Sequence, residues 1–304
     1  MAPTHEPVMV AEVLELMHPS QGGLFVDCTA GLGGHGRALL EAGATRLVAL
    51  DRDPLALALA REALAEFGDR VELVHADYRE LDRVLDERGI DKTAGGVDGG
   101  VDGILADLGV SSMQFDAEGR GFSFRRDEAL DMRMDQSRGP SAADLLRDVG
   151  EAELADVIYR FGEERASRRV ARAIVHARRE SPIDTTGRLA AIVRRAVPHH
   201  GRQRIDPATR TFQALRIWVN GELEGLDAFL ASAARRLLAN ARLAVITFHS
   251  LEDRIVKHTF RALEKSADAA LKILTKRPLV AGESELALNP RSRSAKLRAA
   301  ERLA

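Results

Sequence analysis

The sequence predicts an α/β protein whose Rossmann-like parallel sheet is interrupted by an inserted all-helical domain. Short apolar runs alternate with helical patterns over the first 110 residues, which is typical of repeated βαβ units. From Met113 to about Ile205 the strand pattern stops, and residues 141–180 and 185–197 have helical periodicity. Strand and helix then alternate again towards the C-terminus, and 304 residues are enough for this two-part organisation.

The individual elements follow from apolar runs and from helix-boundary residues. Pro54 suits a first helical turn, Ser141 suits an N-cap, and Pro182 separates two helices of the insert. The predicted strands are 24–26, 47–50, 71–74, 104–108, 243–248, 271–274 and 296–300. The predicted helices outside the insert are 37–42, the segment after Pro54, 79–88, 209–219, 222–238 and the segment after Leu251. The tandem GGVD repeat at 95–102 is interpreted as a loop.

The domain boundaries follow from the change of pattern. We expect residues 1–114 and 216–304 to form the α/β domain and residues 115–215 to form the helical insert. Cys28 is the only cysteine, which excludes an intramolecular disulfide or a cysteine-based zinc cluster and favours a reducing compartment. No run of eighteen apolar residues and no basic, apolar leader occurs, so we expect a cytoplasmic protein without a membrane segment.

The charge of the chain is unevenly distributed. The formal net charge of −2 taken alone argues against a nucleic-acid partner. However, residues 1–110 hold 9 basic and 20 acidic side chains, whereas residues 158–216 hold 14 basic and 5 acidic ones. A block at +9, mostly arginine, could neutralise several phosphates of an RNA, and Arg168, Arg169 and Arg172 are the candidate contacts. The alternative is a solvated helix face paired with acidic neighbours.

A glycine-rich loop follows the first predicted strand. Its sequence, DCTAGLGGHG at 27–36, lets the backbone approach a ligand at the carboxyl end of a parallel strand. Asp51 ends the next strand about 20 residues later, where a carboxylate can accept hydrogen bonds from ribose hydroxyls. The two features predict an adenosine-type cofactor, S-adenosylmethionine in preference to a nicotinamide dinucleotide. The alternative is a set of glycines that serve only a tight turn.

Asp107 follows the fourth predicted strand and is the candidate catalytic residue. An exocyclic amine is methylated once its lone pair is localised and aimed, which acceptors on its N–H groups achieve. The Asp107 carboxylate and the carbonyl of Leu108 could act in this way. Alternatively, Asp107 caps the following turn. His199 and His200 have no second ligand pair at zinc spacing, so no metal site is expected.

Ten ordered blocks of the sequence resemble the ribosomal RNA small subunit methyltransferase H family. The resemblance implies a class I methyltransferase sheet with a helical insert. It also implies S-adenosylmethionine-dependent methylation of cytosine N4 in the decoding region of bacterial 16S ribosomal RNA, so the expected partner is this RNA or the small ribosomal subunit, with a homodimer as a further expectation. The blocks are HEPVM at 5–9, DCTAGLGGHGR at 27–37, LDRDP at 50–54, DLGVSSMQFD at 107–116, RGFSFRRDEALDMRMD at 120–135, SAADLL at 141–146, FGEERASRRVARAIV at 161–175, DPATRTFQALRIWVNGELE at 206–224, ITFHSLEDRIVK at 246–257 and NPRSRSAKLRAAER at 289–302.

The resemblance also implies a set of cofactor-binding residues. Tyr78 would pack on adenine, and Asp107 would face two roles, because a carboxylate that holds the cofactor amine is less free to receive the target amine. The sequence departs from the family pattern at Gly36, Met113 and Tyr78, at Asn240-Ala241, and in the compact segment 264–288. The implied cofactor residues are Gly33, Gly34, His35, Asp51, Tyr78, Asp107 and Gln114.

Two other classes of function remain open at this point. A nicotinamide-dependent oxidoreductase would use the same glycine loop and Asp51, although no clear hydride-transfer residues are present. A ribosome-assembly binding protein with a vestigial cofactor site would keep the basic insert and have no catalytic role.

Overall fold

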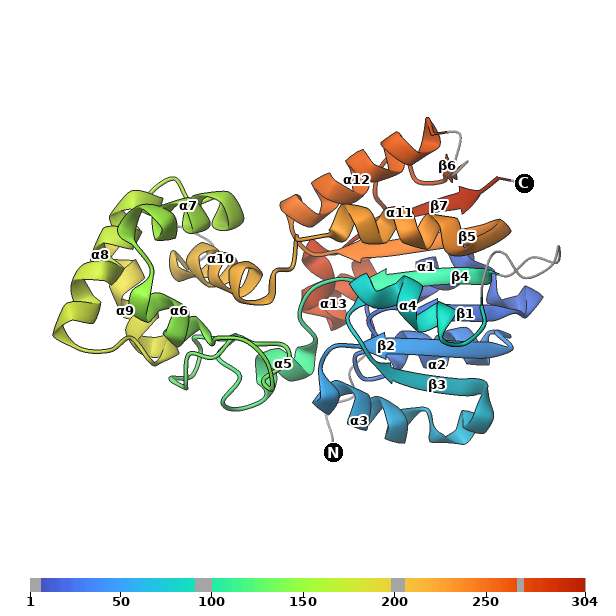
Figure 1. The fold of residues 1–304 in the computed structure, drawn as a ribbon, viewed down its shortest axis with the longest axis horizontal. Coiled ribbons are helices and arrows are strands. Elements are labelled where there is room, and N and C mark those ends of the chain that lie inside the picture. The colour runs from blue at the N-terminus through green and yellow to red at the C-terminus, as the bar shows by residue number, and fades with distance from the viewer. Residues whose placement is uncertain (1–6, 91–99, 198–205, 267–270, 304) are drawn as a thin grey trace. The chain divides into compact units, whose positions relative to one another are not determined.

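The computed structural model describes residues 7–90, 100–197, 206–266 and 271–303 (Figure 1). It divides into two compact units, one formed by Met1–Gly109 with Glu224–Ala304 and the other by Val110–Leu223. The sequence-derived boundaries at 114/115 and 215/216 fall inside two helices, α5 (Ser112–Asp116) and α10 (Ala208–Asn220), and the compact units change over a few residues outside them.

The first unit is built on one sheet of seven strands in the order β3-β2-β1-β4-β5-β7-β6. The pairs among β1 to β5 are parallel, while β7 runs antiparallel to both β5 and β6. The strand order reverses at β1, which lies between β2 and β4, and ligands of open α/β sheets bind beside such a reversal. The strands are β1 (Leu24–Asp27), β2 (Arg46–Asp51), β3 (Val71–His75), β4 (Val101–Asp107), β5 (Leu237–Thr247), β6 (Leu271–Ile273) and β7 (Lys296–Arg302).

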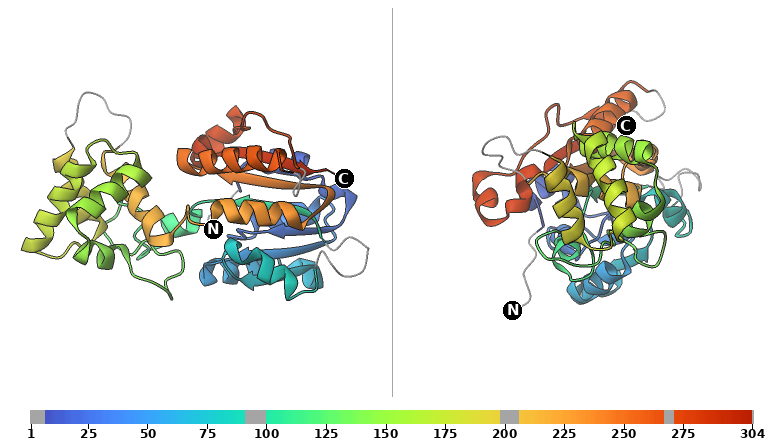
Figure 2. Two further views of the ribbon diagram at one scale, coloured as in Figure 1. Left: turned by 45° about the horizontal axis from the view of Figure 1, so that its top comes forward. Right: turned by 90° about the vertical axis from the view of Figure 1, so that its left-hand side faces the viewer.

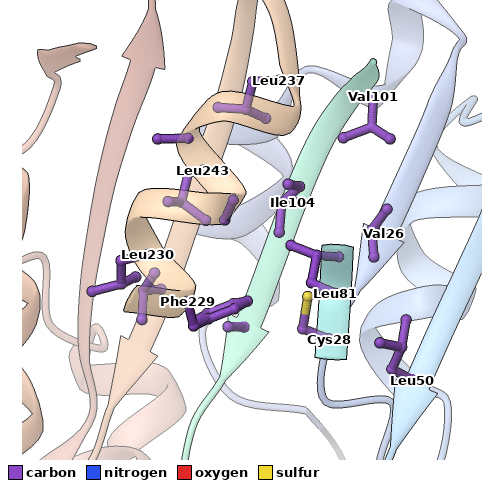
Figure 3. Close-up of a cluster of buried hydrophobic side chains, with 14 of the residues drawn as sticks. Val26, Cys28, Leu50, Leu81, Val101, Ile104, Phe229, Leu230, Leu237 and Leu243 are labelled. Atoms are coloured by element: carbon purple, nitrogen blue, oxygen red, sulfur yellow. The ribbon is translucent and has the colours of Figure 1, made fainter. Parts of the chain in front are cut away.

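Helices cover both faces of this sheet (Figure 2). Alternate strand residues point to opposite faces, so Ile104 packs in one apolar cluster and its neighbour Leu105 in the other. The cluster with Ile104 includes Leu81 and Phe229, which come from two helices that cover this face of the sheet (Figure 3). One face carries α4 (Leu81–Asp86), α11 (Leu226–Arg236) and α12 (Ser250–Glu264), and the other carries α1 (Val10–Met17), α2 (Gly34–Glu41) and α3 (Pro54–Ala63); α13 (Glu283–Leu288) precedes β7.

The second unit is helical and has its own apolar core. Ser141 is the N-cap of the helix over Ala142–Asp148, as expected, since the Ser141 hydroxyl accepts the N–H of Asp144. Residues 117–141 form a long loop that Asn220 anchors, because its side chain accepts the N–H of Met134 and donates to the carbonyl of Met132. Besides α5 and α10, the unit contains α6 (Ala142–Asp148), α7 (Glu151–Gly162), α8 (Ser167–Glu180) and α9 (Thr186–Ala196).

All seven predicted strands are present, whereas the helices α1 and α13 were not predicted and several helix and strand ends differ. Helix α2 begins at Gly34 and not at 37, because a glycine loop with left-handed Gly33 can lead directly into a helix. The sequence pattern predicts one helix over 222–238, but α11 occupies only Leu226–Arg236 and β5 already begins at Leu237. Most of the GGVD repeat lies outside the described residues. None of the helices in the described ranges is long and apolar enough to cross a membrane.

Candidate functional site

The glycine loop connects β1 to α2 at the point where the strand order reverses. Gly31 and Gly33 have φ angles of +52° and +84°, which side-chain-bearing residues rarely adopt. A Cβ on Gly33 would lie 3.1 Å from Cγ of Leu64, and one on Gly34 would lie 2.9 Å from Cγ of Pro7. The loop therefore requires glycine at these positions for its own geometry. It presents backbone atoms in place of side chains near the end of β1.

Asp51 at the end of β2 ties this loop to the neighbouring strand. Its Oδ2 accepts the N–H of Gly31 at 2.8 Å, and its Oδ1 accepts the N–H of Asp53 at 2.8 Å. Burial raises the pKa of Asp51 to about 6, although both hydrogen bonds favour the carboxylate. A carboxylate oxygen has two acceptor sites, so Asp51 can hold the loop and still accept from a ribose hydroxyl.

Tyr78 lies after β3, in a short 3₁₀ turn. Its ring is 4.8 Å from that of Phe229 in a tilted arrangement, and the guanidinium of Arg79 lies 5.7 Å from the Tyr78 ring centroid. Arg79 also donates to both carboxylate oxygens of Asp77, at 2.7 and 2.8 Å. Despite partial burial, these bonds and the charge of Arg52 lower the pKa of Asp77. Asp77 is not among the residues that the sequence predicts for the site; it is the N-cap of the 3₁₀ turn that carries Tyr78.

Asp27 and His35 are buried and form a cluster with the partly exposed Asp107, at the ends of β1 and β4 and the start of α2. His35 Nε2 lies 3.6 Å from Asp107 Oδ2, a distance that is too long for a hydrogen bond and that forms an ion pair when the imidazole is protonated. Burial lowers the pKa of His35, but interaction with Asp107 and the charges of Asp27 and Glu285 outweigh it, so the net pKa is raised. Burial raises the pKa of Asp27 to about 6, although the charge of His35 and a hydrogen bond from Thr29 both act to lower it.

Several buried polar atoms of this cluster lack a hydrogen-bond partner within the described ranges. They are Asp27 Oδ2, Asp107 Oδ1 and both ring nitrogens of His35. Native structures leave few such atoms unsatisfied, and they concentrate where a ligand or an ordered water completes the bonding. Asp27 Oδ2 and the exposed backbone of the glycine loop fit a ligand that carries positive charge and hydrogen-bond donors, as the methionine end of S-adenosylmethionine does, and Asp107 Oδ1 is left to accept from a second donor.

The expected cofactor residues are divided between the two units. The α/β unit holds Gly33, Gly34, His35, Asp51, Tyr78 and Asp107 at the carboxyl ends of its strands. Gln114 belongs to the helical unit, where its Oε1 accepts the N–H of Ser111 in the capping box of α5.

The three candidate RNA contacts are all exposed on α8. Arg172 donates to Glu151 at 3.3 Å, whereas no ion pair involving Arg168 or Arg169 is found among the described residues. Other arginines of the basic block have structural contacts: Arg178, for example, donates to the carbonyls of Leu146 and Val149 at the end of α6. The block is therefore partly a structural feature, and Arg168 and Arg169 are among its exposed charges without an ion pair in the described ranges.

A parallel sheet with one antiparallel strand near its edge, a glycine loop after β1 and an acidic end to β2 define a class I S-adenosylmethionine-dependent methyltransferase. The sequence profile of the MraW methylase family matches residues 2–303, and the chain belongs to this family.

Curated relatives match over almost the whole chain. The chain is 47% identical to the ribosomal RNA small subunit methyltransferase H of Geotalea uraniireducens, with 98% of each chain covered. It is 50% identical to the proteins of the same name from Sorangium cellulosum (98% of this chain, 91% of the relative) and Geobacter sulfurreducens (99% of each). A solved rRNA methylase from Streptococcus thermophilus, with 11% identity, a TM-score of 0.40 and coverage of 97% and 94%, is too distant to support an argument. Neither an oxidoreductase nor a non-catalytic binding protein is supported by these matches.

Proposed function

We propose that this protein transfers the methyl group of S-adenosylmethionine to the N4 amine of a cytidine in the decoding region of 16S ribosomal RNA. The observation that carries the proposal is the match of about half of all residues, over nearly the full length, to proteins named ribosomal RNA small subunit methyltransferase H. The site supports it, because its buried cluster offers carboxylates and no adjacent nucleophile and base of the kind that covalent catalysis needs.

The α/β unit supplies the residues that would hold the methyl donor. The loop backbone at Gly33 and Gly34 would receive its methionine end, Asp51 its ribose hydroxyls and Tyr78 its adenine. His35 and Asp107 line the same edge of the sheet. The bound donor supplies an electrophilic methyl group on a sulfonium, so the protein's task is to position and orient the acceptor.

Asp107 would receive an N–H of the target amine, with the carbonyl of Leu108 as second acceptor. Both residues are held firmly, since the N–H of Leu108 donates to Ile246 at 2.9 Å and the N–H of Asp107 donates to Thr29. Accepting from N4 localises the nitrogen lone pair, which forms the C–N bond as the S–C bond breaks. The methylated nitrogen then loses a proton to water. Such transfer to a base requires the cytidine to be unstacked from its neighbours.

The direct test is methyl incorporation into small subunits that lack the modification, followed by nucleoside analysis of the 16S RNA. We expect N4-methylated cytidine, and recovery of 5-methylcytidine alone would contradict the assignment. Asp107→Asn keeps the shape but turns one acceptor oxygen into a donor, so it should reduce the rate by about 100-fold or more. Asp69→Asn, which alters an exposed carboxyl of the same unit, is the control.

We propose that the exposed face of α8 contacts the RNA substrate. Replacing Arg168 and Arg169 together by alanine should weaken RNA binding and reduce the magnitude of the slope of log affinity against log salt by about 1 to 2. Arg172 is the weaker candidate, because Glu151 already neutralises it in part. Arg235→Ala removes an exposed helical charge from the α/β unit and is the matched control. An unchanged salt slope in the double variant would show that the face is only solvated.

Cytoplasmic location and a homodimer complete the proposal. Small ribosomal subunits are the substrate class, so the enzyme must work where these subunits are assembled. Sedimentation of the purified full chain over a range of concentrations measures the assembly state, and a single species at monomer mass would contradict the homodimer.

A further inference from the structure

Thr29 connects the ends of β1 and β4. Asp27 is the last residue of β1 that pairs with β4, opposite Leu105, and the N–H of Cys28 donates to the Leu105 carbonyl at 2.8 Å. Beyond this point β1 gives way to the glycine loop. The side chain of Thr29 then replaces the missing strand partner, because its Oγ1 accepts the N–H of Asp107 at 2.6 Å.

Asp27 orients this hydroxyl. Its Oδ1 accepts the N–H of Thr29 at 3.0 Å and lies 3.4 Å from Thr29 Oγ1, to which it is the acceptor. A hydroxyl has one proton, and when Asp27 accepts it, the lone pairs of Oγ1 remain for the N–H of Asp107. Asp27 itself is 1% exposed and cannot exchange its partner for solvent.

His35 approaches the same carboxylates from the first turn of α2. Its side chain is 6% exposed and forms the ion pair with Asp107 Oδ2, while the charges of Asp27 and Glu285 also favour its protonated form. Glu285 on α13 is itself held by the N–H of Met9 at 2.9 Å. Asp107 is thus restrained on its backbone by Thr29 and on its carboxylate by His35.

We propose that Thr29 and Asp27 are positioning residues that hold the Asp107 carboxylate where it can accept the N–H of the target amine. The inference rests on the proposed function, because it uses Asp107 as the acceptor for the target N–H. Thr29 holds the backbone of Asp107 at the end of β4. Asp27 orients the Thr29 hydroxyl, and its charge favours the protonated form of His35. Neither residue contacts the reacting atoms in this scheme.

The test compares two threonines that form the same kind of bond. Thr275, which follows the edge strand β6, also uses its Oγ1 to accept a strand N–H, that of Ala299 at 2.9 Å. Thr29→Val and Thr275→Val should therefore lose similar stability. Only Thr29→Val should lower kcat for methyl transfer, by about 10- to 100-fold, as displacement of a reacting group by about 1 Å does. Binding of S-adenosylhomocysteine, measured by calorimetry, should change much less than kcat.

Thr29→Ser restores the hydroxyl and should return kcat to within about 3-fold of the wild-type value. Equal kcat values for the Thr29→Val and Thr275→Val variants, or failure of Thr29→Ser to recover activity lost in the valine variant, would overturn the proposal.

A second measurement needs neither methyl donor nor RNA. NMR titration of the His35 imidazole in the full-length protein should give a lower pKa in Asp27→Asn than in the wild type, because one of the carboxylates that favour the imidazolium is lost. An unchanged His35 titration would overturn the part assigned to Asp27. If the wild-type protein failed to methylate cytidine, the proposed function would fail, and this titration would still report whether the network exists.

Discussion

The buried carboxyl of Asp27 should make the α/β unit less stable as the pH rises, and Asp27→Asn should remove this effect. In the folded protein burial raises the pKa of Asp27 from an ordinary 3.8 to about 6, so the folded state binds more protons than the unfolded state between these values. Stability therefore falls as pH rises through this window. Each tenfold change in the acid dissociation constant corresponds to ~1.4 kcal/mol, which gives a full cost of about 3 kcal/mol above pH 6.

The asparagine variant is suited to this comparison. Its side-chain oxygen can still accept the N–H of Thr29, and its NH₂ group would replace Oδ2, which has no partner within the described ranges. The substitution should also lower the pKa of His35, and because this weakens a second contribution that is lost as pH rises, it acts in the same direction. The gain of the variant over the wild type should therefore increase by about 2 kcal/mol between about pH 4.5 and pH 7.5.

The assay is urea unfolding of both proteins across this range in the absence of methyl donor. Other carboxylates, such as Asp253 beside Arg298, have lowered pKa values and stabilise the protein as pH rises, so only the difference between the two proteins is informative. Asp69→Asn, at an exposed carboxyl of the same unit, is the control for removing one carboxyl group. A flat difference, or one that decreases with pH, would refute the reasoning that Asp27 is ionised at a cost in the folded state.

Two further predictions concern backbone geometry. Gly33→Ala and Gly89→Ala both place a side chain at positive φ and should each cost about 1 kcal/mol in urea unfolding. Only Gly33→Ala places its new Cβ against Leu64 at the end of α3, so it alone should weaken binding of S-adenosylhomocysteine, measured by calorimetry, by about 10-fold. Equal affinities of the two variants would contradict the role of the loop. Asn220→Ala leaves the N–H of Met134 buried without its acceptor and should destabilise the helical unit by about 2 to 4 kcal/mol, and a loss below about 1 kcal/mol would show that the loop is anchored elsewhere.

The central strands of the sheet were predictable because they are short apolar runs between turn residues. β1, β2 and β4 are buried on both faces, so their residues read as continuous apolar stretches regardless of which neighbour they pair with. Boundaries were less predictable. β5 begins at Leu237, directly after α11, and an apolar run at such a junction fits helical and strand periodicity alike.

The basic block shows the limit of counting charges. The sequence indicates an excess of arginine between 158 and 216, but Arg178 serves a helix end and Arg172 an ion pair. Composition does not show which guanidinium binds a carbonyl or a carboxylate, because these partners come from segments distant in the sequence. Arg178, for example, reaches residues 29 and 32 positions away.

The sequence by itself determined the fold class, the family and the positions of Gly33 and Asp51, because local patterns and ordered motifs are properties of the chain before it folds. Only the tertiary structure decided how the chemistry is arranged. It joined Asp27, His35 and Asp107 in one buried cluster, and it placed the Thr29 hydroxyl on the N–H of Asp107, 78 residues further along the chain. Such contacts depend on strand order and burial, and burial also shifts the pKa values within the cluster.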